Sequence, residues 1–346
     1  MTQFVSFEPT RRYSLTGSSS GEPIVASFLT SDINNLQVFL NQYSLGDADR
    51  IEATYTARTH HTCRFKLKST QSSVSGSFLL VVVEPAAEER LAFSAALIEH
   101  LHNRDIPVTP CLSNNQNSYI SLFGDSPALL FKLPEGQPPH QPDLATCKAI
   151  GAFLGKMHAG SQGFSLSYGN PRSLVWLNLA TEELLPQLAK GDAALLTEQL
   201  LRFKHTIDSN PDLPSGALIG SLFADQLFFQ GETLQAVTGF YFSCTDWLLF
   251  DVAQAVNEWC CDEHGELDRQ LTQALLCAYH SERPFTACEG QYWQDILCFS
   301  ATRFWVSRLL TSLPSEREAT PSIAHDPEEY QKKLQRRITG YYPLPC

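Results

Sequence analysis

The stretch from residue 213 to residue 251 constrains the fold of this chain more than any other. An apolar pair at 217–218 runs into a turn at Gly220-Ser221, and the apolar residues 227–229 have the composition of a short strand. A glycine turn follows, after which residues 234–237 begin a second apolar strand. Two short strands in this order hold a loop and a strand end close together. The stretch therefore predicts a site to which a loop and the end of a strand both contribute.

This layout is the one that phosphoryl transfer uses to position a base and metal ligands. The stretch resembles the catalytic segment of the homoserine kinases in the aminoglycoside-phosphotransferase and choline-kinase-like superfamily. In that family a strand leads into His-Ala-Asp-Leu-Phe-x-Asp-Asn-Val-Phe-Phe, and Ile-Ile-Asp-Phe-Tyr-Phe-x-Cys-x-Asp follows. This chain has Ile-Gly-Ser-Leu-Phe-Ala-Asp-Gln-Leu-Phe-Phe at 219–229 and Val-Thr-Gly-Phe-Tyr-Phe-Ser-Cys-Thr-Asp at 237–246.

The residues that carry the family's chemistry differ in this chain. By the resemblance, Ile219 replaces the family's His, Ser221 its catalytic Asp, Gln226 its metal-binding Asn and Gly239 its metal-binding Asp. A serine is no useful base at neutral pH without its own activator, and a glycine supplies no metal ligand. Gln226 keeps an amide oxygen, one methylene further out. We therefore expect a homoserine kinase-like pseudokinase, a binding or regulatory protein without efficient phosphoryl transfer, and assign no catalytic residue and no metal site.

Asp225 is the one carboxylate near this loop, and it supports an alternative. The flanking Leu222-Phe223 fixes the alignment, so Asp225 matches a separate family Asp, and we expect it to orient the loop backbone. The alternative is an active ATP-dependent homoserine or related small-molecule kinase, in the threonine branch of amino-acid metabolism, with Asp225 and Gln226 in altered roles. ATP and Mg²⁺ are expected as cofactors only under this alternative.

The family's nucleotide site is also altered. The turn between the first two strands, at 58–63, has no glycine that would let the backbone close over a phosphate. We expect the cleft between the lobes to be either open and polar or filled by side chains such as Arg58 and His61. Residues 119–133 are interpreted as two strands and the hinge between the lobes. A bound adenine would meet backbone groups of Phe131, Lys132 and Leu133.

The acceptor side of the family site is better preserved. Matches to the family's C-lobe segments include Tyr241, Asp246, Arg303 and Trp305, the last two within Ala-Thr-Arg-Phe-Trp at 301–305. A carboxylate and a guanidinium complement the ammonium and carboxylate of an amino acid. We interpret these four residues as substrate-binding and expect a small amino-acid-like ligand or a protein partner. The other interpretation, that Asp246 and Arg303 only stabilise the lobe, stays open.

At 346 residues the chain is longer than one typical domain, which favours two lobes around a cleft. The resemblance implies an α+β, two-lobed protein-kinase-like fold. We expect an N-terminal extension at 1–30, a small antiparallel-sheet N-lobe at 31–133 and a mainly helical C-lobe at 134–346. Apolar periodicity predicts, besides the strands of the central stretch, a short strand at 24–28, strands around 51–55, 65–67 and 78–83, and helices around 32–40, 91–101, 144–157, 251–259, 271–279, 292–310 and from 326. Asp143 is expected to cap the helix at 144–157.

Composition excludes several classes of partner. A net charge of −12 argues against a nucleic-acid or anionic-membrane surface. The sequence has no apolar run near the ~20 residues of a membrane span, so we expect a cytoplasmic protein. The ten cysteines are scattered without a C-x-x-C pair and are expected to be reduced thiols. Metal-like clusters at 60–63 and 260–264 consist of neighbours that point in different directions, so they predict no metal site.

Overall fold

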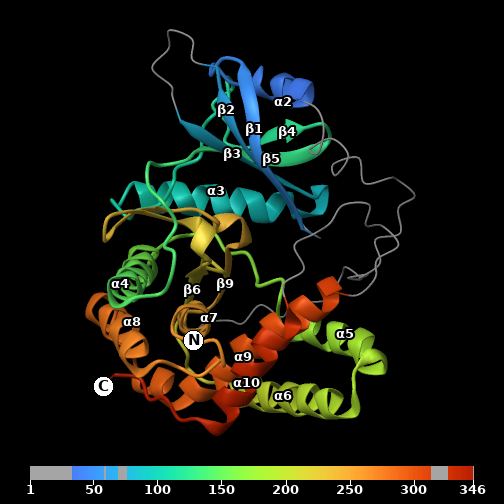
Figure 1. Cartoon of the computed structure of the whole chain (residues 1–346), viewed down its shortest axis with the longest axis vertical. Helices are drawn as coiled ribbons and strands as arrows, with labels where there is room; N and C mark the ends of the chain where they lie inside the picture. Colours follow the sequence, from blue (N-terminus) through green and yellow to red (C-terminus); the bar gives the residue numbers. More distant parts are fainter. Residues whose placement is uncertain (1–32, 58–59, 69–75, 313–325, 346) are drawn as a thin grey trace.

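The structure is a computed structural model of the whole chain, and it describes residues 33–57, 60–68, 76–312 and 326–345. It has a sheet-containing lobe and a larger helical lobe, with helix α3 along the boundary between them (Figure 1). The expected two-lobed, protein-kinase-like α+β fold is therefore confirmed. The predicted extension at 1–30, with its short strand at 24–28, lies outside the described residues.

The N-lobe is built on one antiparallel sheet with the strand order β1-β2-β3-β5-β4. Its elements are α2 (Ile33–Leu40), β1 (Ala48–Ala57), β2 (His60–Leu67), β3 (Ser77–Val83), the 3-10 turn η1 (Pro85–Ala87), α3 (Glu88–His102), β4 (Ser121–Phe123) and β5 (Ser126–Lys132). Alternation along β3 separates the two faces of the sheet. Phe78, Leu80 and Val82 pack with α2, whereas Val81 and Val83 join the core shared with α3 and the C-lobe.

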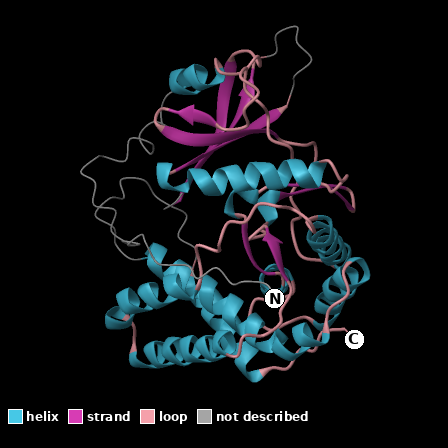
Figure 2. Cartoon of the chain, turned by 180° about the vertical axis from the view of Figure 1, so that it is seen from behind, coloured by secondary structure: helices cyan, strands magenta, loops and turns pink. Residues whose placement is uncertain are grey.

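The C-lobe surrounds helix α7 (Figures 1 and 2). Its helices are α4 (Leu144–Gly160), α5 (Leu174–Leu184), α6 (Lys190–Asp208), α7 (Leu249–Trp259), α8 (Arg269–Glu282), α9 (Ala287–Ser312) and α10 (Pro327–Thr339), with the 3-10 turn η2 (Leu185–Gln187). α4 packs closely on α8 because Gly151 and Gly155 have no side chain. A Cβ on Gly151 would lie 2.1 Å from the carbonyl oxygen of Leu275. These glycines fix the helix that supports the site from below.

Two small antiparallel ribbons lie between α3 and α7 and position the site. Their strands are β6 (Ser215–Leu218) paired with β9 (Cys244–Trp247), and β7 (Leu227–Gln230) paired with β8 (Thr233–Val237). The 3-10 turns η3 (Ala224–Gln226) and η4 (Phe240–Phe242) complete them. The strands expected at 227–229 and 234–237 are confirmed, whereas β9 and α5 were not predicted. The apolar pair at 217–218 ends β6.

Local signals predicted the helix boundaries well. The side chain of Asp143 accepts a hydrogen bond from the backbone N–H of Thr146 and caps α4, as the sequence predicts. Asp326 caps α10 in the same way, through the N–H of Glu328. The nine cysteines of the described residues are all free thiols, as expected.

Candidate functional site

The loop at 219–226, which joins β6 to β7, is held from behind by Asp251 on α7. The carboxylate of Asp251 accepts hydrogen bonds from the backbone N–H groups of Ile219 at 2.8 Å and Gly220 at 2.9 Å. Gly220 has φ +86°, and a Cβ there would lie 2.8 Å from the carbonyl oxygen of Phe242. The turn at this position therefore requires glycine. On the same helix, the side-chain oxygen of Gln254 accepts from the N–H of Leu222 at 3.0 Å.

His158 extends this support to two further helices. Its Nε2 lies 3.3 Å from Oδ2 of Asp251, and its Nδ1 lies 2.8 Å from the hydroxyl of Tyr279. The imidazole is 1% exposed and joins α4, α7 and α8. A ring this enclosed has no access to a substrate, so His158 is a structural hydrogen-bonding residue.

The position that the resemblance assigns to the family's catalytic base holds a serine without a partner. Ser221 is 6% exposed, and its hydroxyl makes no hydrogen bond. A base would have to accept its proton within hydrogen-bond reach. The nearest candidate carboxylate on α7, Asp251, already accepts from two backbone groups of the loop. The serine is therefore not activated by the residues around it.

The two positions that the resemblance assigns to metal ligands form one packing unit. Gln226 is 4% exposed, and its Oε1 accepts from the backbone N–H of Phe223 at 2.9 Å. Gly239 has φ +91°, and a Cβ there would lie only 2.5 Å from Cδ and Nε2 of Gln226. The Gln226 side chain therefore fills the space that a side chain at position 239 would need. These two residues do not fit a magnesium ion, since neither has a carboxylate and the amide oxygen already has a donor.

Candidate metal-binding clusters are also absent from the rest of the chain that the structure describes. There, no cluster of three or more His, Cys, Asp or Glu side chains could hold a metal ion.

The space between β2 and η4 is occupied by aromatic rings. His60 is 5% exposed, and its ring centroid lies 5.0 Å from that of Tyr241 and 4.8 Å from that of Phe242. Tyr55 approaches the same imidazole at 5.9 Å. Burial, with the nearby cations Arg90, His61 and Arg172, lowers the pKa of His60 to about 3. His60 is therefore a neutral ring packed at the start of β2.

The sequence predicts that side chains such as Arg58 and His61 could fill the cleft between the lobes. The structure gives that role to His60, whereas His61 is half-buried and Arg58 lies outside the described residues. Strand register explains the difference, because neighbouring residues of β2 point to opposite faces of the sheet. His60 pairs with Val83 at the end of β3 and points toward η4.

Asp225 lies exposed at the edge of this aromatic group. Burial of the two phenol groups raises the pKa of Tyr55 and Tyr241, and the charge of the Asp225 carboxylate raises both pKa values further. The two phenol groups and Asp225 are therefore neighbours. The sequence-based interpretation that Asp225 orients the loop backbone stays a prediction.

On the acceptor side, Asn170 brings two of the predicted substrate-binding residues together. Its side-chain N–H donates to Oδ2 of Asp246 at 2.7 Å, and its Oδ1 accepts from Nη2 of Arg303 at 3.4 Å. Asp246 also accepts from the N–H of Trp247 at 2.8 Å. Burial raises the pKa of Asp246, an effect that the Arg303 charge opposes. The bridging role of Asn170 had no signal in the sequence.

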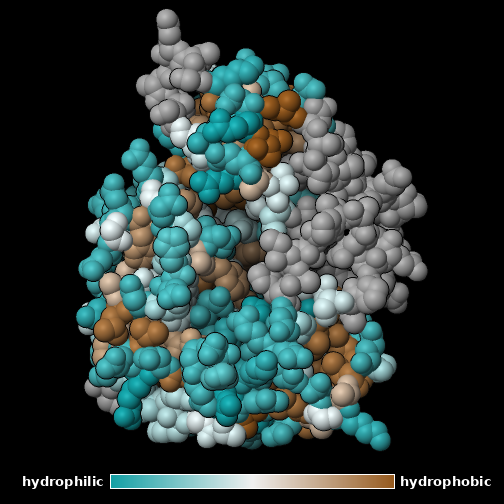
Figure 3. All heavy atoms as spheres, viewed as in Figure 1, coloured by the Kyte–Doolittle hydropathy of each residue, from teal (hydrophilic) through white to brown (hydrophobic). Residues whose placement is uncertain are grey.

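A small cavity opens beside Arg303, with a volume of about 10 Å³. Its lining includes Asn170, Gly220, Phe250, Asp251 and Arg303. The cavity therefore joins the acceptor side to the back of the loop. The surface is visibly hollowed between the two lobes in Figure 3.

The remaining predicted site residues are placed differently. Trp305 is 1% exposed in the core and has no surface to offer a ligand, because residues two apart on a helix point to different sides. Tyr241 is 8% exposed and packs on His60. At the expected hinge, the N–H of Leu133 donates to the carbonyl of Ser77 at 2.9 Å.

The other hinge residues are partly engaged as well. Phe131 pairs with β3 on one side and forms a bridge to Cys111 on the other. Lys132 is exposed. The adenine contacts predicted for residues 131–133 stay a prediction.

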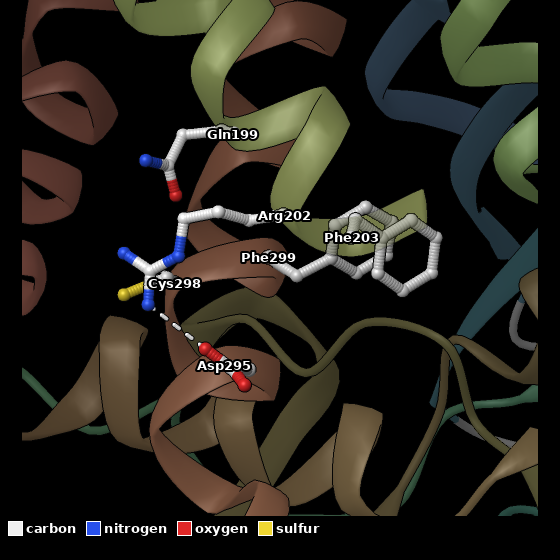
Figure 4. Close-up of a pocket in the computed structure, with 6 residues that line it drawn as sticks. All are labelled: Gln199, Arg202, Phe203, Asp295, Cys298 and Phe299. Atoms are coloured by element: carbon white, nitrogen blue, oxygen red, sulfur yellow. Dashed lines mark hydrogen bonds and ion pairs between the residues drawn. The ribbon is translucent and has the colours of Figure 1, made fainter. Parts of the chain in front are cut away.

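A second cavity lies between α6 and α9 (Figure 4). It has a volume of about 10 Å³ and is lined by Gln199, Arg202, Phe203, Asp295, Cys298 and Phe299. Arg202 closes one side with an ion pair to Asp295 at 2.9 Å. A volume of this size holds about one water molecule, so this cavity has no room for an organic ligand.

Comparison with known proteins agrees with the fold. Residues 64–285 match the family described as "Phosphotransferase enzyme family". The chain is 32% identical over 327 residues to a homoserine kinase of Janthinobacterium sp. (strain Marseille), covering 92% of this chain and 98% of that protein. It is 33% identical over 270 residues to a homoserine kinase of Pseudomonas aeruginosa (strain LESB58), covering 78% and 85%.

Solved structures of the same fold are more distant in sequence. An amicoumacin kinase in complex with AMP-PNP and Ca²⁺ superposes with a TM-score of 0.67 at 10% identity, over 91% of this chain and 94% of that one. A microcompartment-associated aminopropanol kinase gives 0.63 at 15% identity, over 89% and 94%. Among the helices of the described residues, none is both long and apolar enough to cross a membrane.

Proposed function

We propose that this chain, which belongs to the phosphotransferase enzyme family and is homoserine kinase-like, binds a small amino-acid-like ligand without efficient phosphoryl transfer. The observation that carries this proposal is the packing of Gln226 against Gly239. At these two positions the resemblance predicts the metal ligands of the family, and here one side chain fills the space of the other.

The base position supports the same proposal. Phosphoryl transfer depends on positioning and on the neutralisation of charge, and a well-placed general base contributes on the order of 10²–10⁴ in rate. Ser221 has neither a negative charge nor a hydrogen-bonded activator. The loss of base and metal positions together removes the main groups that would act on a γ-phosphate.

The packing between the lobes also supports it. His60, Tyr241 and Phe242 form ring contacts in the space between β2 and η4, which lies above the loop. A triphosphate held there would have to displace a buried aromatic group and bring its charge beside the neutral imidazole. Ligand binding without a nucleotide therefore agrees better with this packing than a nucleotide-dependent transfer does.

The second candidate is an active homoserine kinase or related small-molecule kinase. The comparisons favour it, since the relatives named homoserine kinase match nearly the whole chain at about a third identity. The exposed Asp225 beside Tyr241 is the residue that could take the role of a base in such an enzyme. ATP and Mg²⁺ would then be the cofactors.

Steady-state formation of ADP from Mg·ATP and homoserine separates the two candidates. Kinase turnover is commonly about 1–100 per second, and loss of the base alone lowers it by about 10²–10⁴ to at most about 1 per second. Loss of the metal ligands should lower it further, so we expect less than about 0.1 per second for this chain. Turnover near one per second that disappears in Asp225→Ala would establish the active kinase and overturn our proposal. An Asp49→Ala variant on the exposed start of β1 is the matched control.

Thermal-shift titration tests the binding part of the proposal. A ligand that binds only the folded state raises the melting temperature, and the shift grows with the logarithm of the ligand concentration above Kd. Stabilisation by one amino-acid-like ligand without metal supports a binding protein. Stabilisation that needs Mg·ATP and homoserine together supports the enzyme, and a lack of any shift points to a protein partner.

A further inference from the structure

Two segments of the N-lobe form one continuous surface at the edge of its sheet. They are residues 33–46, which contain α2, and residues 111–124, which contain β4. The backbone N–H of Asn115 donates to the carbonyl of Gln42 at 2.8 Å, and the side-chain N–H of Gln42 donates to the carbonyl of Leu122 at 2.9 Å. We call the surface formed by these two segments the neutral face.

Buried contacts fix the shape of the neutral face from beneath. The hydroxyl of Tyr43 donates to the hydroxyl of Ser121 at 2.9 Å. The ring centroids of Phe39 and Phe123 lie 5.8 Å apart. Because these side chains belong to the core under α2, the two segments present one surface and do not move as separate loops.

The neutral face contains no charged residue. Each segment has 14 residues and ends just before an aspartate, Asp47 in one case and Asp125 in the other. Since 18% of the whole chain is charged, 28 residues would carry about five charges at the same frequency. Charged residues are depleted from the centre of protein–protein interfaces, because a charge buried without a partner is costly. The composition of this surface therefore indicates a contact with protein.

Apolar side chains are exposed on the same surface. Val38 is 68% exposed and Leu122 is 54% exposed. Val38 precedes Gln42 by four residues, a spacing that places both on one side of the helical turns, and Gln42 contacts Leu122. Apolar side chains lie at the surface of the N-lobe in Figure 3, where Figure 1 draws α2 and β4. The neutral face therefore combines exposed apolar groups with a lack of charge.

The neutral face is large enough for a stable contact. Ten residues of its first segment and eleven of its second are at least partly exposed. A standard interface uses about 20–30 residues from each partner. The surface therefore has the size of one side of such an interface.

The polar groups of the neutral face favour a second copy of this chain as the partner. Nine of its residues are Asn or Gln. A side-chain amide carries both a donor and an acceptor, so a surface rich in amides is complementary to a copy of itself. A two-fold axis brings the same surface of two subunits together, an arrangement in which a charged surface would meet its own charge. The exposed amides include Asn34, Asn41, Asn115, Gln116 and Asn117.

The net charge of the chain favours the same arrangement. Two copies with a charge of −12 each repel one another. A contact through the neutral face keeps the charged surfaces of the two copies apart. A strongly charged partner, in contrast, would find no opposite charge within this surface.

We propose that the neutral face is the interface of a two-fold homodimer, in which Val38 and Leu122 lie at the centre and the amides surround them. This interface is independent of the proposed function. The face of the sheet that packs with α2 is opposite to the face that joins the core shared with the C-lobe.

Sedimentation velocity of the full chain at about 1–100 µM tests the inference, since standard interfaces have dissociation constants from about micromolar downward. The monomer has a mass of 38.6 kDa, so the dimer should sediment with about twice that mass. Raising the salt from about 0.05 M to about 0.5 M should tighten the dimer, because salt screens the repulsion between the two net charges. A dimer that dissociates in salt would be held by ion pairs, which the neutral face cannot form, and would overturn the inference.

Two variants assign the contact to this surface. Val38→Glu and Leu122→Glu each place a charge at its centre. Because the two-fold axis repeats each substitution, a loss of about tenfold per copy becomes about a hundredfold rise in the dissociation constant. Leu201→Glu is the matched control, since Leu201 is 62% exposed on α6 and the substitution adds the same charge. The control should keep the dimer.

The two variants are measured separately, so that one still decides if the other does not fold. Wild-type protein that remains a monomer up to about 100 µM overturns the inference. A dimer that every folded variant of the neutral face retains also overturns it. The same holds for a dimer that Leu201→Glu weakens as strongly as Val38→Glu does, because the contact then lies elsewhere.

Discussion

The back and the front of the loop at 219–226 differ in how fully their polar groups are used. Behind the loop, Asp251, Gln254 and His158 each accept or share hydrogen bonds in a buried network, although Nε2 of Gln254 has no partner. In front of it, the hydroxyl of Ser221 has no partner, and Gln226 turns its oxygen back to the loop's own backbone. The back holds the conformation of the loop, whereas under the proposed function the front does not present the groups that phosphoryl transfer needs.

This difference shows which constraints act on each side. An unmatched buried donor costs about 1–3 kcal/mol, so folding stability alone requires the residues behind the loop. Groups that only face a substrate contribute nothing to stability when they point into a cleft. They can therefore be exchanged for residues that pack better, as Gln226 and Gly239 do here.

The largest effect is expected at the back. Asp251→Ala would leave the backbone N–H groups of Ile219 and Gly220 and the ring of His158 without their shared acceptor. The free energy of unfolding should fall by about 3–6 kcal/mol, as measured by urea denaturation. Asp143→Ala, which removes only a helix cap, should cost about 1 kcal/mol. Equal losses in both variants would remove the distinction between the back of the loop and an ordinary surface contact.

The second effect concerns the front. Gly239→Ala should lower the free energy of unfolding by about 2–3 kcal/mol, because φ is +91° and the new Cβ meets Gln226. In a Gln226→Ala background the loss should shrink by about 1 kcal/mol. Gly163→Ala is the matched control, since its φ is +81° with no atom within 4 Å of the added Cβ. If Gly239→Ala in the wild type, Gly239→Ala in the Gln226→Ala background and Gly163→Ala all lose the same stability, the packing of Gln226 on Gly239 contributes nothing to the free energy of unfolding.

The third effect depends on pH. His60 binds a proton below about pH 6.5 when the chain is unfolded but only near pH 3 when it is folded. The unfolded state therefore takes up the extra proton as the pH falls, and stability is lost from pH 6.5 downward. Between pH 6.5 and pH 5 the His60 contribution should amount to about 2 kcal/mol.

Chemical denaturation at both pH values measures this contribution as a difference between variants. His60→Gln should lose less stability than the wild type between pH 6.5 and pH 5. His61→Gln should change the pH dependence less, because its ring is only half-buried. An unchanged slope in His60→Gln would mean that the imidazole is accessible to protons in the folded protein.

The features that sequence could predict are those that local chemistry decides. The cap at Asp143, the apolar strand at 78–83 and the glycine turn at Gly220 each depend on neighbours in the chain, and the structure has all of them. The resemblance also identified Asp246 and Arg303, which the fold brings to the same asparagine.

The features that it could not predict depend on packing between distant segments. The space filled by Gln226 is apparent only once η3 and η4 are placed side by side, and the choice of His60 over His61 follows from strand register. Trp305 matched the family as well as Arg303 did, but the helix turns it into the core. Arg90 lies in an ordinary helical pattern, so the sequence gives no sign that its Nε and Nη2 are buried without a hydrogen-bond partner.

Restoration of the front tests the account most directly. We would compare ADP formation from Mg·ATP and homoserine by the wild type and by the Ser221→Asp, Gln226→Asn, Gly239→Asp triple variant. The account predicts turnover below about 0.1 per second for the wild type and at least a tenfold gain in the triple variant, since the support behind the loop is intact. Wild-type turnover near one per second that equals or exceeds that of a folded triple variant would contradict it.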